Sequence, residues 1–294
     1  MYLVTKWFGT FLCDKTGIKK YILFQKNEKK IAEKLLMISQ GMILTEEKEL
    51  SKKNDIVVFE KRLQIIGKYL PDDDFFKSFI LKPEEYGFNF DLLKKASLIV
   101  SQENASKKLS SPDFQIVQMI KTLDDFIQTS NLLLERLDSW SDFCPPDNRI
   151  DPLKNTYETV NSEIINVQNQ IEKEMHVVAP NISIVVGPLI GARLISYAGG
   201  LQRLAMLPSS TIQILGAEKA LFRFKKQGSL PPKHGIIFQH PYINKAGRSE
   251  RGKIARVLAA KISTAAKADA FTKRDLSKNL KEELEIRIKE IRNP

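Results

Sequence analysis

The amino-acid sequence predicts a multi-domain α+β protein with three parts, and three observations support this prediction. The 294 residues are 43% hydrophobic and 28% charged, a globular balance with enough length for about two domains or one large one. Two apolar runs with heptad spacing occupy the middle of the chain. Residues 1–180 hold 25 Lys and Arg against 27 Asp and Glu, whereas residues 181–294 hold 21 against eight.

Residues 1–107 are expected to form a small α/β domain. Three short stretches have the apolar and aromatic composition of strands: Tyr2–Cys13, Lys20–Gln25 and Asp55–Glu60. Asn27–Gln40 carries apolar residues at helical spacing and is followed by a glycine, which predicts a helix with a C-terminal stop. The polar run over residues 101–112 is predicted to be a linker.

Residues 108–180 are predicted to form an antiparallel helical hairpin with a coiled-coil seam. Apolar residues recur at steps of three and four from Ile116 to Trp140, interrupted only at Ser130, and again from Leu153 to Val178. Three prolines in residues 143–152 separate the two runs. The second run has few apolar residues outside its seam, which suits a coiled coil within the chain or between chains. We expect self-association through Ile116, Leu123, Leu133, Leu137, Tyr157, Ile164 and Ile171.

Residues 181–294 are predicted to form an all-α basic domain. Glycine and proline clusters separate five helical stretches: Ile184–Ala198, Leu201–Met206, Ser210–Phe224, Lys253–Ala268 and Leu276–Ile291. Small residues such as those of ARVLAAKISTAAKADAF dominate the packing faces, so we expect helices to approach closely. Gly235–Gln239 is the only stretch there that could instead be a strand.

The basic residues concentrate within this last domain. Lys219–Arg274 contains 14 Lys and Arg but only Glu250 and Asp269 as acids. A segment with charges of one sign repels itself unless an anion binds it, and the usual anion is a nucleic-acid backbone. A solvated basic surface or a patch for an acidic protein would have the same composition.

Motifs for catalysis and metal binding are largely missing from the sequence. Gly247–Lys253 matches the GxxxxGK part of a phosphate-binding loop, but Ile254 stands where a magnesium-binding hydroxyl should follow, and the preceding residues are not an apolar strand. His234 and His240 lie six residues apart without a nearby cysteine, so we expect no metal site. Glu218 is an acid inside a basic stretch, for which a helix-start role, an ion pair with Lys219 and recognition of a base or partner all remain open.

The chain offers no feature of a secreted or membrane protein. Cys13 and Cys144 cannot form a disulfide framework or a four-ligand zinc site, and they suit a reducing compartment. The longest apolar stretch, Ile182–Ala192, is about half the length of a membrane span. The N-terminus lacks the plan of a signal peptide. We therefore expect a soluble cytoplasmic protein with no membrane contact.

Several strings in the last third of the chain together resemble the Nop domain. They are Ala179–Asn181, Gly191–Leu194, Leu207–Phe222, Pro232–Gly235, Gln239–Pro241 and Arg251–Arg256. The string GAEKALF is very specific to this family, and the dense match covers about residues 176–292. The preceding α/β part and helical hairpin follow the order of parts in the archaeal scaffold of box C/D ribonucleoproteins.

The resemblance implies a scaffold with three partners and no enzymatic activity or cofactor of its own. The N-terminal domain would hold fibrillarin, the 2′-O-methyltransferase, and the hairpin would pair two scaffolds into a homodimer. The Nop domain would bind box C/D guide RNA at a kink-turn together with its kink-turn-binding ribosomal-type protein. The residues where RNA and that protein meet would be Gly216, Ala217, Glu218 and Lys219. The RNA face would comprise Lys219, Arg223, Lys226, Lys233, His234, Gln239, His240, Lys245, Arg248, Arg251, Lys253 and Arg256.

The function expected from the sequence is therefore to position fibrillarin for methylation of ribosomal or transfer RNA. Two alternatives remain at this point. The chain could be a general basic RNA-binding protein, which would bind kinked and straight RNA equally. It could also be an enzyme that binds a nucleotide in a P-loop-like turn, which would require the glycine loop to follow a strand.

Overall fold

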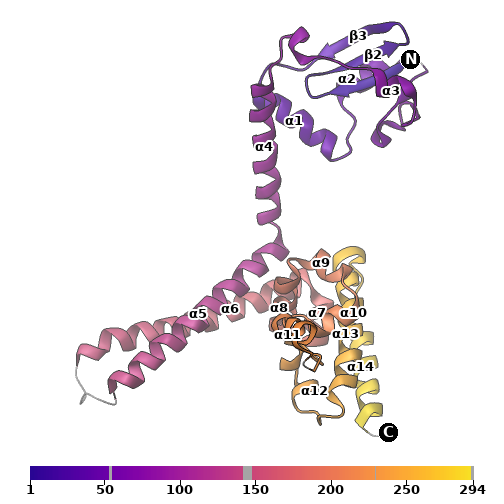
Figure 1. The fold of residues 1–294 in the computed structure, drawn as a ribbon. Helices are drawn as coiled ribbons and strands as arrows, with labels where there is room; N and C mark the ends of the chain where they lie inside the picture. The colour runs from indigo at the N-terminus through magenta and orange to yellow at the C-terminus, as the bar shows by residue number, and fades with distance from the viewer. Residues whose placement is uncertain (53–54, 142–147, 229, 293–294) are drawn as a thin grey trace. The chain divides into compact units, whose positions relative to one another are not determined.

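The computed structural model describes residues 1–52, 55–141, 148–228 and 230–292. The chain divides into two compact units, Met1–Lys108 and Leu109–Pro294, and each unit is described by itself (Figure 1). Helices prevail, and all strands within the described residues lie in the first unit. The coarse prediction of a multi-domain α+β protein is confirmed.

The first unit is built on a five-stranded sheet with strand order β3-β2-β1-β4-β5. The strands are β1 (Tyr2–Lys6), β2 (Gly9–Asp14), β3 (Gly17–Leu23), β4 (Val57–Val58) and β5 (Lys68–Tyr69). The first three are antiparallel neighbours, whereas β4 runs parallel to β1 and to β5. The stretch Tyr2–Cys13 therefore forms a hairpin, because Trp7 and Phe8 turn the chain between the paired residues Lys6 and Gly9.

Helices pack on both faces of this sheet. Helix α1 (Glu28–Ser39) begins after Asn27, whose side-chain oxygen accepts hydrogen bonds from the first turn. Together with α4 (Phe90–Leu109), it buries a core that includes Phe8, Phe11 and Phe88. The core of the other face includes Leu3, Leu12 and Val58, and α2 and η1 contribute to it. The shorter helices of the unit are α2 (Thr45–Ser51), η1 (Lys61–Leu63), α3 (Asp74–Ser78) and η2 (Pro83–Tyr86).

The prediction of a linker over residues 101–112 is wrong for most of that range. Helix α4 continues without a break to Leu109, through the run SQENASKKL. These residues include several good helix formers and neither glycine nor proline, so their polarity does not end the helix. The next helix begins at Pro112, whose missing N–H is harmless in a first turn.

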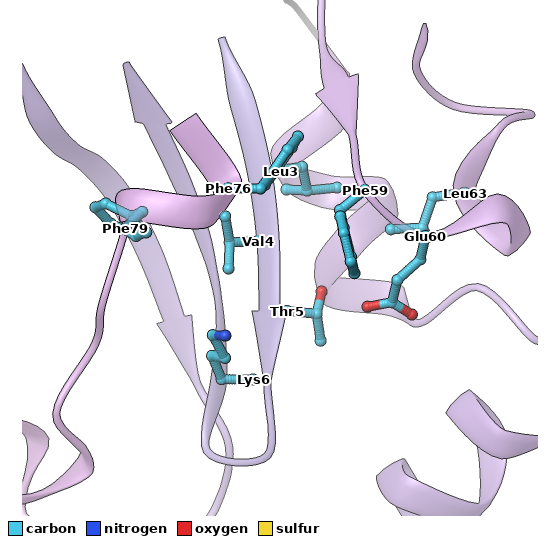
Figure 2. A pocket seen from close by; sticks show the side chains of 9 residues that line it. All are labelled: Leu3, Val4, Thr5, Lys6, Phe59, Glu60, Leu63, Phe76 and Phe79. Carbon is cyan, nitrogen blue, oxygen red and sulfur yellow. The ribbon is translucent and has the colours of Figure 1, made fainter. Parts of the chain in front are cut away.

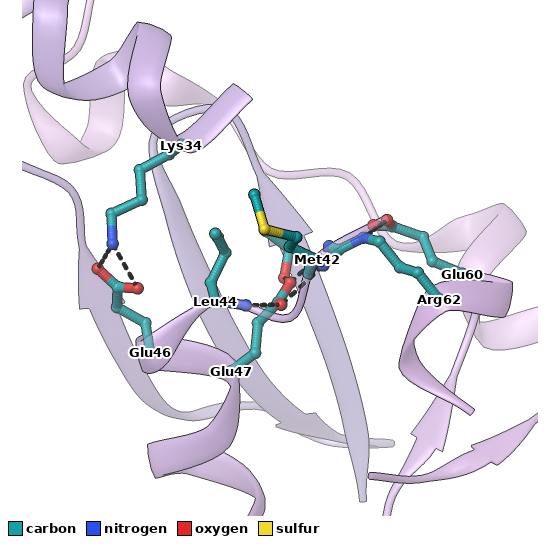
Figure 3. A network of polar contacts seen from close by, with 8 residues as sticks. Lys34, Met42, Leu44, Glu46, Glu47, Glu60 and Arg62 are labelled. Carbon is teal, nitrogen blue, oxygen red and sulfur yellow. Dashed lines mark hydrogen bonds and ion pairs between the residues drawn. The ribbon is translucent and has the colours of Figure 1, made fainter. Parts of the chain in front are cut away.

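A buried ion-pair network joins α2 to the segment that follows β4 (Figure 3). The Glu47 carboxylate is fully buried and accepts hydrogen bonds from Nη1 and Nη2 of Arg62 at 2.8 and 2.5 Å. It also accepts from the main-chain N–H of Leu44 at 2.7 Å and from the hydroxyl of Thr5 at 2.6 Å. Arg62 also pairs with Glu60 at 2.5 Å. Both oxygens of Glu47 have donors, so removal of either Glu47 or Arg62 would leave a buried charge without its main partner.

The second unit begins with two long helices that lie side by side, α5 (Pro112–Ser141) and α6 (Asp151–Val178) (Figure 1). The proline-rich connection predicted at residues 143–152 is described only from Asn148, where a 3₁₀ turn, η3 (Asn148–Ile150), leads into α6. Cys144 lies outside the described residues, whereas Cys13 is buried in the first unit. The seam position Ser130 donates a hydrogen bond to Asn161 at 2.8 Å, so the interruption in the apolar pattern of α5 is matched by a polar residue of α6.

The remaining helices complete the second unit, and most of them pack against α13 (Arg251–Lys267). They are α7 (Pro180–Val186), α8 (Pro188–Ala198), α9 (Leu201–Met206), α10 (Ser209–Ile214), α11 (Glu218–Gln227), η4 (Ile236–Gln239), α12 (Pro241–Asn244), the π-helical turn η5 (Ala268–Thr272) and α14 (Ser277–Arg292). Ala255, Ala259, Ala265 and Ala266 of α13 are fully buried. Their small side chains allow close approach of the neighbouring helices, as the sequence predicts.

Three predicted elements of this unit differ from the structure. Ile184–Ala198 is broken at Gly187, which has a φ of +84° before Pro188, so α7 and α8 meet at 117°. Ser210–Phe224 is broken at Gly216, also at a φ of +84°. The possible strand Gly235–Gln239 is the 3₁₀ helix η4. Periodicity missed both breaks because the apolar spacing resumes at once beyond each glycine.

Among the described helices, none alone has the length and apolar character to cross a membrane. Helices α7 and α8 reach such length and composition only when the bent pair is taken together. Most residues of the two helices are buried or partly buried within the second unit.

Candidate RNA and protein interface

The residues assigned to RNA by resemblance lie on three segments of the second unit. Lys219, Arg223 and Lys226 occupy positions i, i+4 and i+7 of α11, so their side chains share one face of that helix. The second segment contains η4 and the loop before it, and the third is the turn into α13 with the first turns of that helix. The second segment carries Lys233, His234, Gln239 and His240. The third carries Lys245, Arg248, Arg251, Lys253 and Arg256.

A tight turn at Gly216 and Ala217 starts α11. A Cβ at Gly216 would lie 2.6 Å from Cγ1 of Ile236, and the φ of this residue is +84°, so the turn requires glycine. The Gly216 N–H donates to the Glu218 carboxylate at 2.8 Å. The Ile236 N–H donates to the Leu215 carbonyl at 2.8 Å. The Glu218 side chain therefore closes the turn that precedes α11, and the turn is held against η4.

The loop before η4 is fastened to the same turn. The Gly235 N–H donates to the Gln213 carbonyl at 2.8 Å, and the Gln213 side chain donates to the Lys233 carbonyl at 2.7 Å. A Cβ at Gly235 would lie 2.0 Å from the Leu215 carbonyl oxygen, so these two segments touch main chain to main chain. Lys233 is thus positioned next to the start of α11.

Helix α11 projects from the rest of the unit. None of its residues is buried, and Phe222 and Phe224 are exposed together with the lysines and arginines around them. The ammonium of Lys226 lies 5.9 Å from the centroid of the Phe222 ring. A helix that buries nothing contributes little to folding, so its composition of cations and exposed rings suits contact with another molecule.

A ring stack connects the loop before η4 to α13. His234 stacks on Phe238 with ring centroids 4.5 Å apart and an angle of 15° between the planes. The guanidinium carbon of Arg251 lies 5.4 Å from the centroid of the same Phe238 ring. Burial lowers the pKa of His234, and the positive charges of Arg251 and Lys233 lower it further. This lowering favours the neutral imidazole, whose flat ring carries one donor and one acceptor nitrogen.

Two predicted contact residues are used inside the fold. His240 is buried, and its Nδ1 accepts the Tyr242 N–H at 3.2 Å as the cap of α12. Burial lowers the pKa of His240. Arg251 donates to the carbonyls of Ala246 and Asn244 at 3.0 and 3.3 Å, and so closes the turn before α13. The exposed predicted residues are Lys219, Arg223, Lys226, Lys233, Gln239, Lys245, Arg248, Lys253 and Arg256.

The two acids within Lys219–Arg274 differ in position. Asp269 is buried, and its carboxylate accepts the N–H of Asn181 and of Ile182 at 3.2 and 2.9 Å, and the side-chain amide of Asn181 at 2.6 Å. Burial raises the pKa of Asp269, while these donors act in the opposite direction. Of the two acids only Glu250 reaches the surface. The exposed part of this stretch therefore has an even higher ratio of basic to acidic residues than the stretch as a whole.

The hydrogen bonds of Asp269 were not predicted from the sequence. They hold the start of α7 against the turn that follows α13. The Asn181 side-chain amide also donates to the Arg274 carbonyl at 2.9 Å, and its oxygen accepts the Leu276 N–H at 2.7 Å. The one available signal was an aspartate in η5, directly after the basic and small-residue run of α13. Its partner lies 88 residues earlier in the chain, beyond the reach of any local pattern.

Two features that could have indicated catalysis find no support within the described residues. No group of three or more histidine, cysteine or acidic side chains is arranged to hold a metal ion there. The P-loop-like stretch Gly247–Lys253 follows the short helix α12, not a strand, and Gly252 lies in the first turn of α13. The stretch thus lacks the strand that a phosphate-binding loop requires.

The residues predicted for self-association fall into two groups. Ile116, Leu123 and Ile171 are at most 1% exposed and belong to the core of their own chain. Leu133, Leu137, Tyr157 and Ile164 lie farther along the hairpin and are partly exposed. Around them Leu132, Leu134, Trp140 and Ile165 are exposed.

Comparison with known proteins gives a consistent result. A family model described as "Nop: snoRNA binding domain, fibrillarin" matches residues 145–290. An uncharacterised NOP5 family protein of Methanocaldococcus jannaschii is 52% identical over 124 residues, which cover 42% of this chain and 30% of that protein. Nucleolar protein 56 of Schizosaccharomyces pombe is 49% identical over 106 residues, covering 36% and 21%. Nucleolar protein 58 of Yarrowia lipolytica is 50% identical over 105 residues, covering 36% and 20%.

Among solved structures, a crystal structure of a fibrillarin/Nop5p complex contains a chain with the same fold. The TM-score is 0.53 at 27% identity, and the match covers 98% of this chain and 99% of that one. By contrast, the matches to these three curated relatives span between about a fifth and a third of the length of those proteins.

The relatives correct one expectation and show which family the chain resembles. Several are named nucleolar proteins, so the cytoplasmic localisation expected from composition is wrong. Composition alone cannot distinguish one compartment from another. The specific string around Gly216, the matched family model and the shared fold agree: residues 145–290 match the Nop domain, and the chain is similar to proteins of the NOP5 family.

Proposed function

We propose that this protein is a non-catalytic scaffold of a box C/D guide-RNA ribonucleoprotein, which positions fibrillarin for 2′-O-methylation. The observation that carries the proposal is the fold match over 98% of the chain to a protein solved in complex with fibrillarin. The cationic surface of the Nop domain adds independent support, since it is what a guide-RNA scaffold needs.

RNA binding is proposed for the face formed by α11, the loop before η4 and the turn into α13. Lysine and arginine contacts to phosphates fix the register of RNA but carry little sequence information. His234 and the exposed rings of α11 can stack on unpaired bases, the usual source of specificity in RNA recognition. This combination favours a bent RNA with unpaired bases over a regular duplex.

The junction residues Gly216, Ala217, Glu218 and Lys219 are proposed to meet both the kink-turn and the protein bound to it. The turn is rigid because Ile236 packs against Gly216 and hydrogen bonds hold it to its neighbours. A rigid turn complements one surface shape only. Because each partner supplies part of this surface, binding of one raises the affinity for the other.

Self-association is proposed for the outer part of the hairpin, as a coiled coil between two copies. Residues Leu133, Leu137, Tyr157 and Ile164 remain partly exposed within one chain, whereas the inner seam is already buried. Burial of these residues against a second copy would remove exposed apolar surface from water. Two copies would then place two fibrillarins on one guide RNA.

The N-terminal unit is proposed to hold fibrillarin. A scaffold that binds both fibrillarin and the guide RNA converts methyl transfer from a bimolecular encounter into an effectively intramolecular one. The division of the chain into two compact units supports this separation of tasks.

The test measures RNA affinity with and without the kink-turn-binding protein, on kink-turn RNA and on a straight duplex of equal length. We expect tight binding only to the kink-turn RNA with its protein. Replacement of Lys219 by alanine should weaken this assembly and leave fibrillarin binding unchanged. Lys289→Ala on α14 removes the same charge from an exposed site elsewhere and should change neither. Equal affinity for both RNAs would instead identify a general basic RNA-binding protein.

A further inference from the structure

The N-terminal unit contains a groove where its sheet is incomplete. Strand β4 pairs with β1 only at Tyr2 and Leu3, and the chain leaves the sheet after Val58. Strand β1 nevertheless continues to Lys6, paired on its other side with β2. The last three residues of β1 therefore have an open edge.

The hydrogen bonds between β1 and β4 fix the direction of the main-chain groups of β1. The Val57 N–H donates to the Met1 carbonyl at 2.8 Å, so the first residue directs its carbonyl toward β4. Groups on a strand alternate between its two edges, so Leu3 and Thr5 also direct their N–H and carbonyl that way. Leu3 has its partner strand in β4. Among the described residues, none pairs with the main chain of Thr5 on this edge.

A cavity of about 190 Å³ follows this open edge (Figure 2). Consecutive residues of β1, from Leu3 to Lys6, line it, which shows that the cavity runs along the strand and not over one face of the sheet. Phe59 and Glu60 border it on the side of Thr5, and Phe76 and Phe79 border it as well. Phe59 is 53% exposed, and its ring lies 5.6 Å from that of Phe76.

The dimensions and chemistry of the groove indicate which class of ligand it can bind. Pockets for cofactors and drug-sized ligands measure about 300–1,000 Å³, whereas a cavity of about 150 Å³ accepts one benzene ring. The groove thus has room for one large apolar side chain. Lys6 and Glu60 place both signs of charge at its border, which suits a polypeptide better than a polyanion. An unpaired strand edge beside an apolar pocket is the arrangement that binds an extended peptide by strand addition.

We propose that this groove binds an extended segment of fibrillarin, whose main chain pairs with Thr5 and whose apolar side chain enters the cavity beside Phe59 and Phe76. The proposal rests on the proposed function, because it takes fibrillarin as the partner of the N-terminal unit. Main-chain pairing provides register, and the anchored side chain provides most of the binding energy.

The first test measures binding of the full-length chain to fibrillarin by calorimetry. Phe59→Asp places a charge in the groove and should weaken binding at least tenfold. Ile65→Asp is the matched control, because Ile65 is 82% exposed and does not line the groove. This variant should bind within twofold of the unaltered chain, and both variants should keep its thermal melting profile.

The second test observes the main chain directly and needs no substitution. Labelling with ¹⁵N-threonine reports 11 amides, among them Thr5 and Thr10. Fibrillarin should slow the hydrogen exchange of the Thr5 amide at least tenfold. Thr10 is the internal control, since it pairs with Ile22 of β3 and should be protected in both states.

Three results would overturn the proposal. If fibrillarin binds while the Thr5 amide exchanges as in the free chain, or while Phe59→Asp retains full affinity, the groove is not the docking site and the scaffold function stands. If the unaltered chain does not bind fibrillarin at all, both the proposed function and the groove assignment are refuted.

Discussion

Helix α11 provides a direct measure of how the Nop domain holds RNA. Lys219, Arg223 and Lys226 are exposed on one face of a helix without buried residues, so their replacement by glutamine should leave the fold intact. Glutamine is also a good helix former, and it keeps a polar, unbranched side chain while removing the charge.

Each lost phosphate contact reduces the slope of log affinity against log salt concentration by about 0.7–0.9. The triple glutamine variant should therefore reduce the slope by about 2.1–2.7. Between 50 and 200 mM salt, each lost contact makes the affinity change about 2.6- to 3.5-fold smaller.

The assay is a salt titration of binding to kink-turn RNA in the presence of its protein, with circular dichroism to verify helix content. Lys289→Gln on α14 is the control with the same change of charge per substitution and should leave the slope unchanged. If the triple variant keeps the slope of the unaltered chain, α11 does not contact phosphates and the RNA face must be sought elsewhere.

Three further predictions concern stability and assembly. Glu47→Ala should lower the free energy of unfolding by about 3–5 kcal/mol in chemical denaturation, because it leaves the Arg62 guanidinium buried with its main partner gone. Stability should rise as the pH rises toward about 6.5, the ordinary pKa of histidine, because the lowered pKa makes folded His240 bind fewer protons than an unfolded histidine. His240→Asn should reduce this rise and keep a side chain able to cap α12. Gly216→Ala should weaken assembly on the kink-turn complex at least tenfold, because its Cβ would strike Ile236 and distort the junction turn.

Each of these predictions has its own control. Glu33→Ala removes an exposed ion pair with Lys30 and should cost under about 1 kcal/mol, so an equal loss for Glu47→Ala would contradict the role of the buried network. An unchanged pH profile in His240→Asn would show that His240 does not contribute to it. Gly228→Ala also replaces a glycine with positive φ, but its Cβ would meet open space, so assembly should survive. Equal loss in both glycine variants would remove the junction role of Gly216.

The helices of the second unit could largely be predicted, because apolar spacing reports which face of a helix is buried. Leu201–Met206 matches α9, and Leu276–Ile291 lies within a residue of α14 at each end. The breaks at Gly187 and Gly216 were missed, since a glycine with positive φ can interrupt a helix without disturbing the spacing on either side. Pro188, directly after the first of them, was the one local signal of a break.

The candidate site was predictable in charge but not in geometry. The sequence shows that the basic residues concentrate in Lys219–Arg274, yet it does not show that Arg251 closes a turn or that His240 caps a helix. These roles depend on which main-chain groups lie nearby after folding. The edge groove of β1 was equally inaccessible, because it exists only where β4 leaves the sheet after Val58.

The central claim is that this chain organises methylation without performing it. The most direct measurement is methyl transfer from labelled S-adenosylmethionine to a target RNA, with guide RNA and kink-turn-binding protein present throughout. The account predicts transfer only when this chain and fibrillarin are both added, and none when either one is left out. Transfer by this chain in the absence of fibrillarin, or undiminished transfer by fibrillarin in its absence, would contradict it.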